Sequence, residues 1–114
     1  MNRAGMRVWV SSMSTQSEML RLAFEEDPEK AAGITFMGTA FPGIDTLNYL
    51  GLHPQARQVG FFMTPWLREG LAQRRAELMP LDYMGMSRHL QTMPPVDVAI
   101  AQLTPPDADG WCSP

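Results

Sequence analysis

The chain has 114 residues, of which 45% are hydrophobic and 18% are charged, and its net charge is −3. These shares are typical of a globular chain, and the acidic balance argues against nucleic-acid binding, which needs clustered Lys and Arg. With Cys112 alone and His53 far from His89, no internal disulfide can form and we expect no metal site. No apolar run approaches the ~20 residues of a membrane span. A signal-peptide pattern is also missing, so we expect a cytoplasmic protein.

The first strand and helix are predicted close to the amino terminus. Residues 6–10 are rich in side chains that suit a buried strand. Residues 15–18 have the spacing of a capping box, in which Thr15 is the N-cap and Glu18 its partner. This box predicts a helix that begins after Thr15 and that Pro28 terminates.

The pattern of strand, loop and helix then repeats. Residues 34–37 predict a second strand, and the loop 38–43 follows it. Apolar residues at helical spacing over 44–50 predict a helix, which Gly51 should end in a left-handed turn.

A third strand is predicted at residues 59–63. Thr64 and Pro65 then have the character of an N-cap and a first helical residue, because proline's missing amide costs nothing there. A short fourth strand is predicted at residues 78–81.

The last helix and strand complete the alternation. Apolar residues at helical spacing over 86–93 predict a helix that ends before Pro94-Pro95. Residues 96–103 are apolar on both faces apart from Asp97 and Gln102, as in a central strand of a parallel sheet covered by helices on both sides. The sequence therefore predicts an α/β fold, an open and mostly parallel sheet with flanking helices.

In such a sheet, ligands bind at the loops that leave the carboxyl ends of the strands. The loop 11–14 offers hydroxyl groups beside a helix N-terminus, which favours either an anion or simple helix capping. The loop 38–43 has glycines on both sides of Thr39 and either brings backbone amides close to a ligand or forms a tight turn. Neither loop carries a glycine-rich nucleotide motif.

The loop 104–114 is the most distinctive of the strand-end loops. It holds Asp107, Asp109, Cys112 and Ser113 outside the predicted last strand, so it is a candidate wall of a site. As a catalytic centre it is poor, because no histidine lies near Cys112 or Ser113 in the sequence. The two aspartates are more typical of turn capping than of an acid/base pair.

The end of the chain resembles one enzyme family. The segment is Val96-Asp97-Val98-Ala99-Ile100-Ala101-Gln102-Leu103-Thr104-Pro105-Pro106-Asp107-Ala108-Asp109-Gly110-Trp111-Cys112-Ser113. It is similar to a segment of the acetyl-CoA hydrolase/acyl-CoA transferase family, which includes acetate and 4-hydroxybutyrate CoA-transferases. Residues 5–10 and 81–90 resemble earlier parts of that family in the same order. The match departs at Pro114, where the family has an aliphatic or aromatic residue followed by glycine.

The resemblance implies a covalent mechanism in which a glutamate attacks an acyl-CoA thioester and becomes a glutamyl-CoA thioester. That glutamate lies in the second half of family members, so we assign no catalytic residue here. The glutamates of this chain, all in helix-like patterns, are Glu18, Glu25, Glu26, Glu29, Glu69 and Glu77. The predicted substrate-binding residues, all on strand-end loops, are Thr39, Asp107, Gly110 and Ser113.

We therefore expect residues 1–114 to be the amino-terminal part of such a domain, incomplete because the family runs on into further sheet after this loop. The implied substrates are acyl-CoA and a carboxylate, with no permanently bound cofactor and a homo-oligomer as an option for the full-length protein. Two alternatives stay open. One is a non-catalytic module that binds a small anion through residues 11–15, and the other is a degenerate fragment that associates with a longer paralogue.

Overall fold

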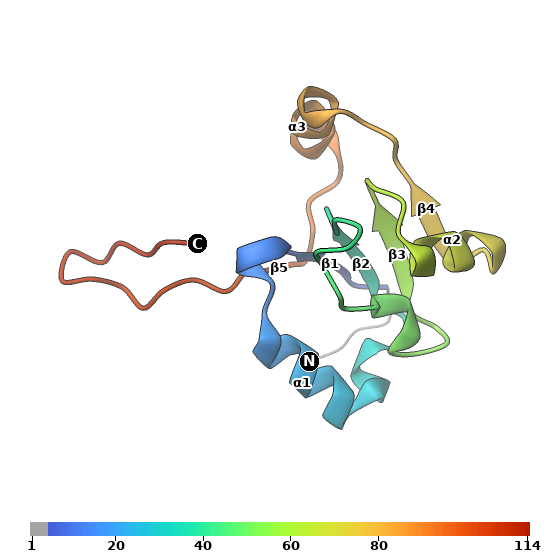
Figure 1. Cartoon of the computed structure of the whole chain (residues 1–114), viewed down its shortest axis with the longest axis horizontal. Coiled ribbons are helices and arrows are strands. Elements are labelled where there is room, and N and C mark those ends of the chain that lie inside the picture. Colours follow the sequence, from blue (N-terminus) through green and yellow to red (C-terminus); the bar gives the residue numbers. More distant parts are fainter. Residues whose placement is uncertain (1–4) are drawn as a thin grey trace.

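The computed structural model of the protein describes residues 5–114. These residues form a five-stranded sheet in the order β4-β3-β2-β1-β5, and every neighbouring pair is parallel (Figure 1). The strands are β1 (Arg7–Val10), β2 (Thr35–Gly38), β3 (Arg57–Gly60), β4 (Ala76–Leu78) and β5 (Val98–Ile100). The open parallel α/β fold predicted from the sequence is confirmed.

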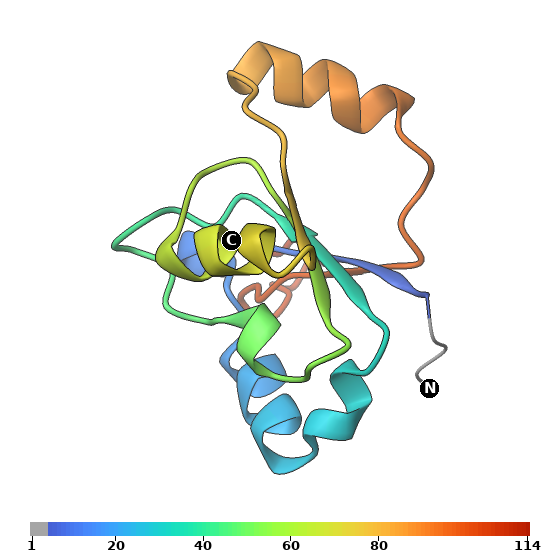
Figure 2. The same ribbon diagram turned by 90° about the vertical axis from the view of Figure 1, so that its right-hand side faces the viewer.

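Three α-helices and three 3-10 turns connect the strands within the described residues. The helices are α1 (Glu18–Glu26), α2 (Pro65–Ala72) and α3 (Tyr83–Thr92). The 3-10 turns are η1 (Met13–Thr15), η2 (Pro28–Ala31) and η3 (Tyr49–Gly51). Figure 2 shows α3 standing apart from α1 and α2.

The core lies on the face of the sheet that α1, η3 and α2 cover. Phe36 of β2 has no exposed surface, and its ring meets that of Phe24 of α1 edge-on at 5.5 Å and stacks on Tyr49 of η3 at 4.7 Å. Because strand side chains alternate, Trp9 points to the other face. Its ring lies 6.2 Å from Phe61, which lies 6.2 Å from His89, so α3 packs on that second face.

The two predicted helix starts have different outcomes. Thr64 caps α2 as expected, because its buried hydroxyl oxygen accepts a hydrogen bond from the amide of Leu67 at 3.1 Å. Thr15 does not cap α1, because its hydroxyl group instead donates to the carbonyl oxygen of Ser12 at 2.8 Å within η1. Ser17 is the N-cap, accepting from the amide of Leu20, and α1 therefore begins at Glu18.

The helix predicted over residues 44–50 does not form. The segment is a turn followed by η3, in which Asn48 accepts a hydrogen bond from the amide of Gly51 at 3.0 Å. Gly51 lies within η3 and has no left-handed backbone. The physical reason is that Asp45 turns inward and bonds to the amides of two other loop residues, which replaces helical hydrogen bonding at this position.

Two strand positions also differ from the prediction. β3 ends at Gly60, so residues 61–63 belong to the loop that leads into α2. The fourth strand is Ala76–Leu78 rather than residues 78–81, because Gln58, Val59 and Gly60 of β3 set its register.

The prediction that residues 96–103 form a central strand is wrong. They contribute only β5, which pairs with β1 and has no second neighbour within residues 5–114. Val98 is 37% exposed, so the apolar pattern on both faces does not lead to burial here. Hydrophobicity alone gave no information about whether another element would cover this strand.

Candidate functional site at the carboxyl ends of β1 and β2

The loops that leave β1 and β2 lie side by side, because the two strands are parallel neighbours. The hydroxyl oxygens of Ser12 and Thr39 are 3.0 Å apart and share a hydrogen bond. Gly38 permits this close approach, since a Cβ atom there would lie 2.4 Å from the carbonyl oxygen of Val10. Thr39, a predicted substrate-binding residue, therefore lies at the edge where ligands bind in parallel sheets.

Asp45 joins the two loops from within. Its carboxylate accepts a hydrogen bond from the amide of Met13 through Oδ1 and from the amide of Phe41 through Oδ2, both at 2.7 Å. Asp45 is only 5% exposed. A buried carboxylate is costly unless it is well hydrogen-bonded, and these two charge-assisted bonds offset that cost. Asp45 thus fixes the loop after β1 against the loop after β2.

Met13 has a left-handed backbone, with φ of 56°. A non-glycine residue there carries a cost of order 1–3 kcal/mol, which the surrounding structure must offset. Met13 is held by a hydrogen bond from its amide to Asp45 and by one from the amide of Gln16 to its carbonyl oxygen. Backbone strain of this kind concentrates at functional sites, which supports this loop as a candidate.

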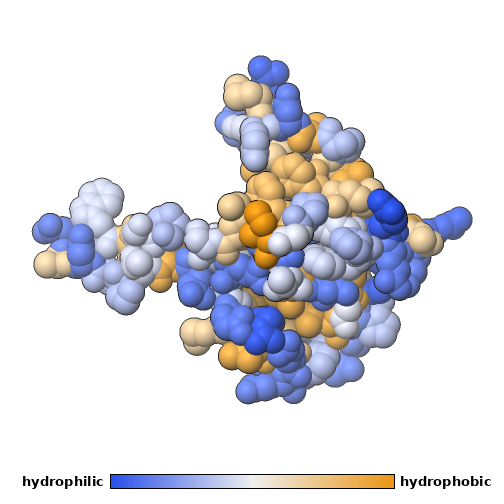
Figure 3. Space-filling model, viewed as in Figure 1, coloured by the Kyte–Doolittle hydropathy of each residue, from blue (hydrophilic) through white to orange (hydrophobic). Residues whose placement is uncertain are grey.

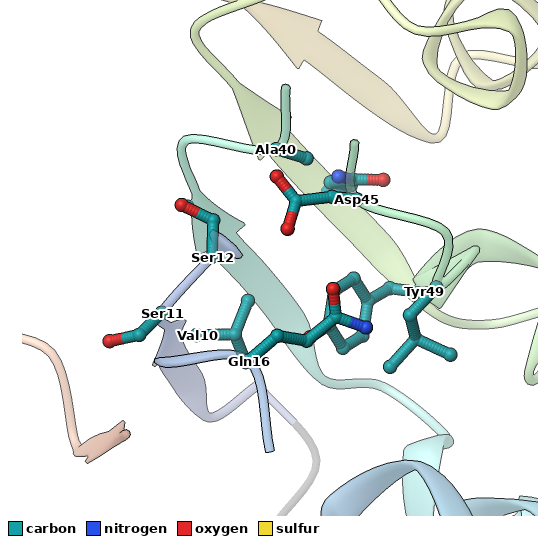
Figure 4. A pocket seen from close by; sticks show the side chains of 10 residues that line it. Val10, Ser11, Ser12, Gln16, Ala40, Asp45 and Tyr49 are labelled. Carbon is teal, nitrogen blue, oxygen red and sulfur yellow. The ribbon is translucent and has the colours of Figure 1, made fainter. Parts of the chain in front are cut away.

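A small cavity lies beneath these loops (Figure 4). Figure 4 shows polar side chains around it from both strand-end loops and from η3, and Ser11, Ser12, Gln16, Asp45 and Tyr49 are among the residues that line it. Its volume of about 10 Å³ is at the lower limit for a single water molecule. Gln58 of β3 also lines it, and its buried Oε1 atom has no hydrogen-bond partner among the described residues. Polar groups therefore line part of the cavity, which is too small for an acyl-CoA.

Tyr49 also lines this cavity. Burial, and then the nearby negative charge of Asp45, raise the pKa of Tyr49 well above its ordinary value. A phenol is already protonated at neutral pH, and this rise keeps that of Tyr49 neutral at higher pH as well.

Several backbone amides of residues 11–16 already donate to partners within the protein. The amide of Met13 is bound to Asp45, and those of Thr15 and Gln16 are bound to carbonyl oxygens within the loop. At the start of α1 the amide of Glu18 is occupied as well, because it donates a hydrogen bond to the side-chain oxygen of Gln102. The negative charge of Asp45 would also repel a second anion.

The other predicted substrate-binding residues lie in residues 104–113, which we call the arm. The arm projects away from the sheet after β5 and stands clear of the remaining surface (Figures 1 and 3). Thr104 and Ser113 close its base through two hydrogen bonds of 2.8 Å, one from each backbone amide. All of its residues are exposed, and none of them lines the cavity.

Asp107 caps the turn at the tip of the arm. Its Oδ1 atom accepts hydrogen bonds from the amides of Asp109 and Trp111, both at 2.9 Å. Gly110 has φ of 87°, a left-handed conformation that favours glycine. The structure therefore gives Asp107 and Gly110 roles in shaping the arm, and their part in substrate binding, like that of Ser113, stays a prediction.

None of the glutamates lines the cavity among the described residues. Glu18 is bound to Arg21 on the surface of α1, and this hydrogen bond lowers the pKa of Glu18. Glu69 accepts a hydrogen bond from Gln73 on α2. Glu77 does not belong to a helix as the sequence pattern suggested, because it lies exposed on β4. The site therefore presents no glutamate as a nucleophile.

Sequence reasoning missed the residues that organise this site. Asp45 and Tyr49 were hidden by the expected helix over 44–50, and Gln58 lay just outside the third strand predicted at residues 59–63. The one available signal was that Asp45 is the single acidic residue in the sequence between Lys30 and Glu69. Residues 5–114 bring together no group of three side chains that could hold a metal ion, and none of their helices is long and apolar enough to cross a bilayer.

The comparisons with known proteins identify no relative. No protein-family model matches the chain, and no curated protein matches it. The resemblance to the CoA-transferase family therefore rests on the sequence segments named above, chiefly residues 96–113.

Proposed function

We propose that this chain is the amino-terminal part of an acyl-CoA transferase or acyl-CoA hydrolase. One observation carries the proposal. The segment that resembles the family runs as β5 beside β1 and then leaves the sheet as the arm, at the carboxyl ends of the strands. That edge is where parallel α/β sheets bind their ligands.

The proposed chemistry proceeds through two covalent intermediates. A glutamate carboxylate attacks the thioester carbonyl, the C–S bond breaks, and CoA leaves as a thiolate with an acyl-glutamyl anhydride behind it. The thiolate then attacks the glutamyl carbonyl, releases the acyl group as a carboxylate and forms glutamyl-CoA. A second carboxylate reverses these steps in transfer, whereas water ends them in hydrolysis. Backbone amides must stabilise each oxyanion.

We propose that the glutamate comes from outside residues 1–114 in the working enzyme. The six glutamates of this chain lie on α1, η2, α2 and β4, away from the cavity. The part of this chain in the reaction is then to position substrate, with the arm as a wall of the acyl-CoA site and Thr39 at the carboxyl ends of the same sheet.

The arm's role can be tested by NMR with acetyl-CoA. Titration of the isotope-labelled chain should shift the backbone amide signals of Asp109, Trp111 and Ser113. Asp107→Ala should abolish those shifts, because it removes the acceptor that shapes the tip. Asp82→Ala is the matched control, since Asp82 accepts from the amide of Gly85 in the same way but at the start of α3. Arm signals that stay unchanged at millimolar acetyl-CoA would contradict the proposal.

The missing glutamate predicts a second result. The chain alone should release no thiol from acetyl-CoA, with or without a carboxylate acceptor. Addition of a glutamate-bearing carboxyl-terminal half from a family enzyme should restore turnover and a glutamyl-CoA adduct visible by mass spectrometry. Turnover by the chain alone, at about 1 s⁻¹ or more, would overturn the claim.

One alternative is favoured by a specific observation, and the other is not. The free edge of β5 favours association with a longer paralogue, because an unpaired edge presents backbone groups to another strand. A stable complex with such a paralogue, formed without any binding of acetyl-CoA, would select this alternative. Asp45 disfavours an anion site at residues 11–15, because its carboxylate occupies the amide of Met13.

A further inference from the structure

A groove at the opposite, amino-terminal end of the sheet is lined by three arginines. Arg57 begins β3, and Arg74 and Arg75 form the turn between α2 and β4. The groove has a volume of about 310 Å³. Small-molecule sites typically begin at about 300 Å³. Unlike the cavity beneath the strand-end loops, this groove is large enough for a ligand.

Arg75 makes one wall of the groove rigid. Its Nη1 atom donates to the carbonyl oxygen of Leu50 at 3.0 Å and to that of Ala56 at 3.3 Å, and its Nη2 atom donates to Gln73 at 2.8 Å. Arg74 next to it has a left-handed backbone, with φ of 57°. The turn is therefore held in one shape, and Arg74 is presented at the surface beside the groove.

Arg57 and Arg74 have unused guanidinium groups. Neither side chain has a hydrogen-bond or ion-pair partner within residues 5–114, and both are exposed. Glu77 is the one acidic residue that lines the groove, so three positive charges face one negative charge. This local excess lies in a chain whose net charge is −3. Thr35 adds a hydroxyl group to the same lining.

We infer that this groove binds the phosphate or diphosphate group of a small ligand through Arg57 and Arg74. A guanidinium group offers paired donors that match two oxygens of a phosphate. Arg75 supplies charge without giving up its structural bonds. The inference goes beyond the proposed function, since the groove lies at the other end of the strands from the arm. It also places the anion site away from residues 11–15, where Asp45 already holds the negative charge.

The test is calorimetric titration at low ionic strength with three ligands: pyrophosphate, ADP and coenzyme A. Arg57→Gln and Arg74→Asn should each weaken binding about tenfold, the loss expected for one charge-assisted hydrogen bond. Asparagine is chosen for Arg74 because it tolerates the left-handed backbone. Arg88→Gln is the matched control, since Arg88 is also exposed but lies on α3. Glu77→Gln should tighten binding, because it removes the repelling charge.

The three ligands distinguish the source of the phosphate. Pyrophosphate binding that weakens about tenfold in Arg57→Gln and is unchanged in Arg88→Gln supports the site, whichever larger ligand also binds. Coenzyme A binding without pyrophosphate or ADP binding would overturn it. An equal loss in Arg57→Gln and Arg88→Gln, or no saturable binding at millimolar concentrations, would overturn it as well. Asp107→Ala should leave this binding unchanged, which separates this inference from the proposed role of the arm.

Discussion

The central strands of the sheet and its edge strand β5 are built from similar residues but differ in burial. Val8, Val10 and Phe36 on the central strands are nearly inaccessible, whereas Val98 on β5 is 37% exposed. Both regions have apolar side chains at strand positions. The difference arises because α1, η3 and α2 cover the centre, while no described element packs beyond β5. Apolar residues therefore make a strand suitable for burial, but whether its side chains are buried depends on the elements that pack against it.

Truncating one side chain in each region gives the largest expected difference in stability between them. Phe36→Ala should lower the free energy of unfolding by about 3–5 kcal/mol, because it leaves a cavity between Phe24 and Tyr49. Val98→Ala should cost well under about 1 kcal/mol, since its side chain already meets solvent. Denaturant unfolding of the two variants measures both values. Similar losses would mean that β5 is buried in solution.

Asp45 holds together the loops that follow the central strands β1 and β2. Replacing its carboxylate with an amide tests this role, because only one oxygen atom is exchanged. Asp45→Asn should destabilise the protein by about 1–3 kcal/mol, because an amide group replaces an acceptor that faces a backbone N–H. Amide exchange at Met13 and Phe41 should rise in the same variant. Asp97→Asn is a useful comparison, since its carboxylate also accepts from a backbone amide, that of Arg7, but is exposed. An equal effect of the two substitutions would argue against a special role for burial.

A smaller effect on stability is expected at the start of α1, where the observed N-cap and the predicted one differ. Ser17→Ala should cost about 1 kcal/mol, the usual effect of losing an N-cap. Thr15→Ala should cost less, because its hydroxyl group donates within η1 and leaves no helical amide without a partner when it is removed. Thermal unfolding of both variants separates the observed cap from the one that the capping-box pattern suggested. A larger loss for Thr15→Ala would restore the capping-box interpretation.

The smallest effect on stability is expected in the arm. Asp107→Ala should change the free energy of unfolding by less than about 0.5 kcal/mol, as for most exposed positions. It should nevertheless speed hydrogen exchange at the amides of Asp109 and Trp111, which lose their acceptor. Exchange measured by NMR in the two proteins tests this directly. A large loss of global stability would show that the arm packs on the sheet in solution.

Local signals in the sequence were sufficient for several elements. Thr64 and Pro65 marked the start of α2, and Pro28 and Pro94 marked where α1 and α3 could no longer continue. These signals act within a few residues, through proline's missing amide and a side chain that caps the nearest free N–H. The alternation of strand and helix then gave a parallel sheet, because parallel strands require crossover connections.

The candidate site could be predicted only in outline. The strand-end loops and Thr39 followed from the topology rule for parallel sheets, but Asp45 and Gln58 did not. Asp45 acts by meeting the amides of Met13 and Phe41, which come from two different loops. No pattern of neighbouring residues encodes such a meeting.

The local sequence was sufficient for the alternation of strands and helices, the start of α2 and the carboxyl-terminal limits of α1 and α3, because each depends on bonding between residues close in the chain. Three features could be seen only in the tertiary structure. β5 is an edge strand, residues 44–50 are not a helix, and Arg57 and Arg74 line one groove. Each of these depends on which distant segments come together. Burial and charge pairing are properties of such contacts, and a chain position acquires them only when its neighbours in space are fixed.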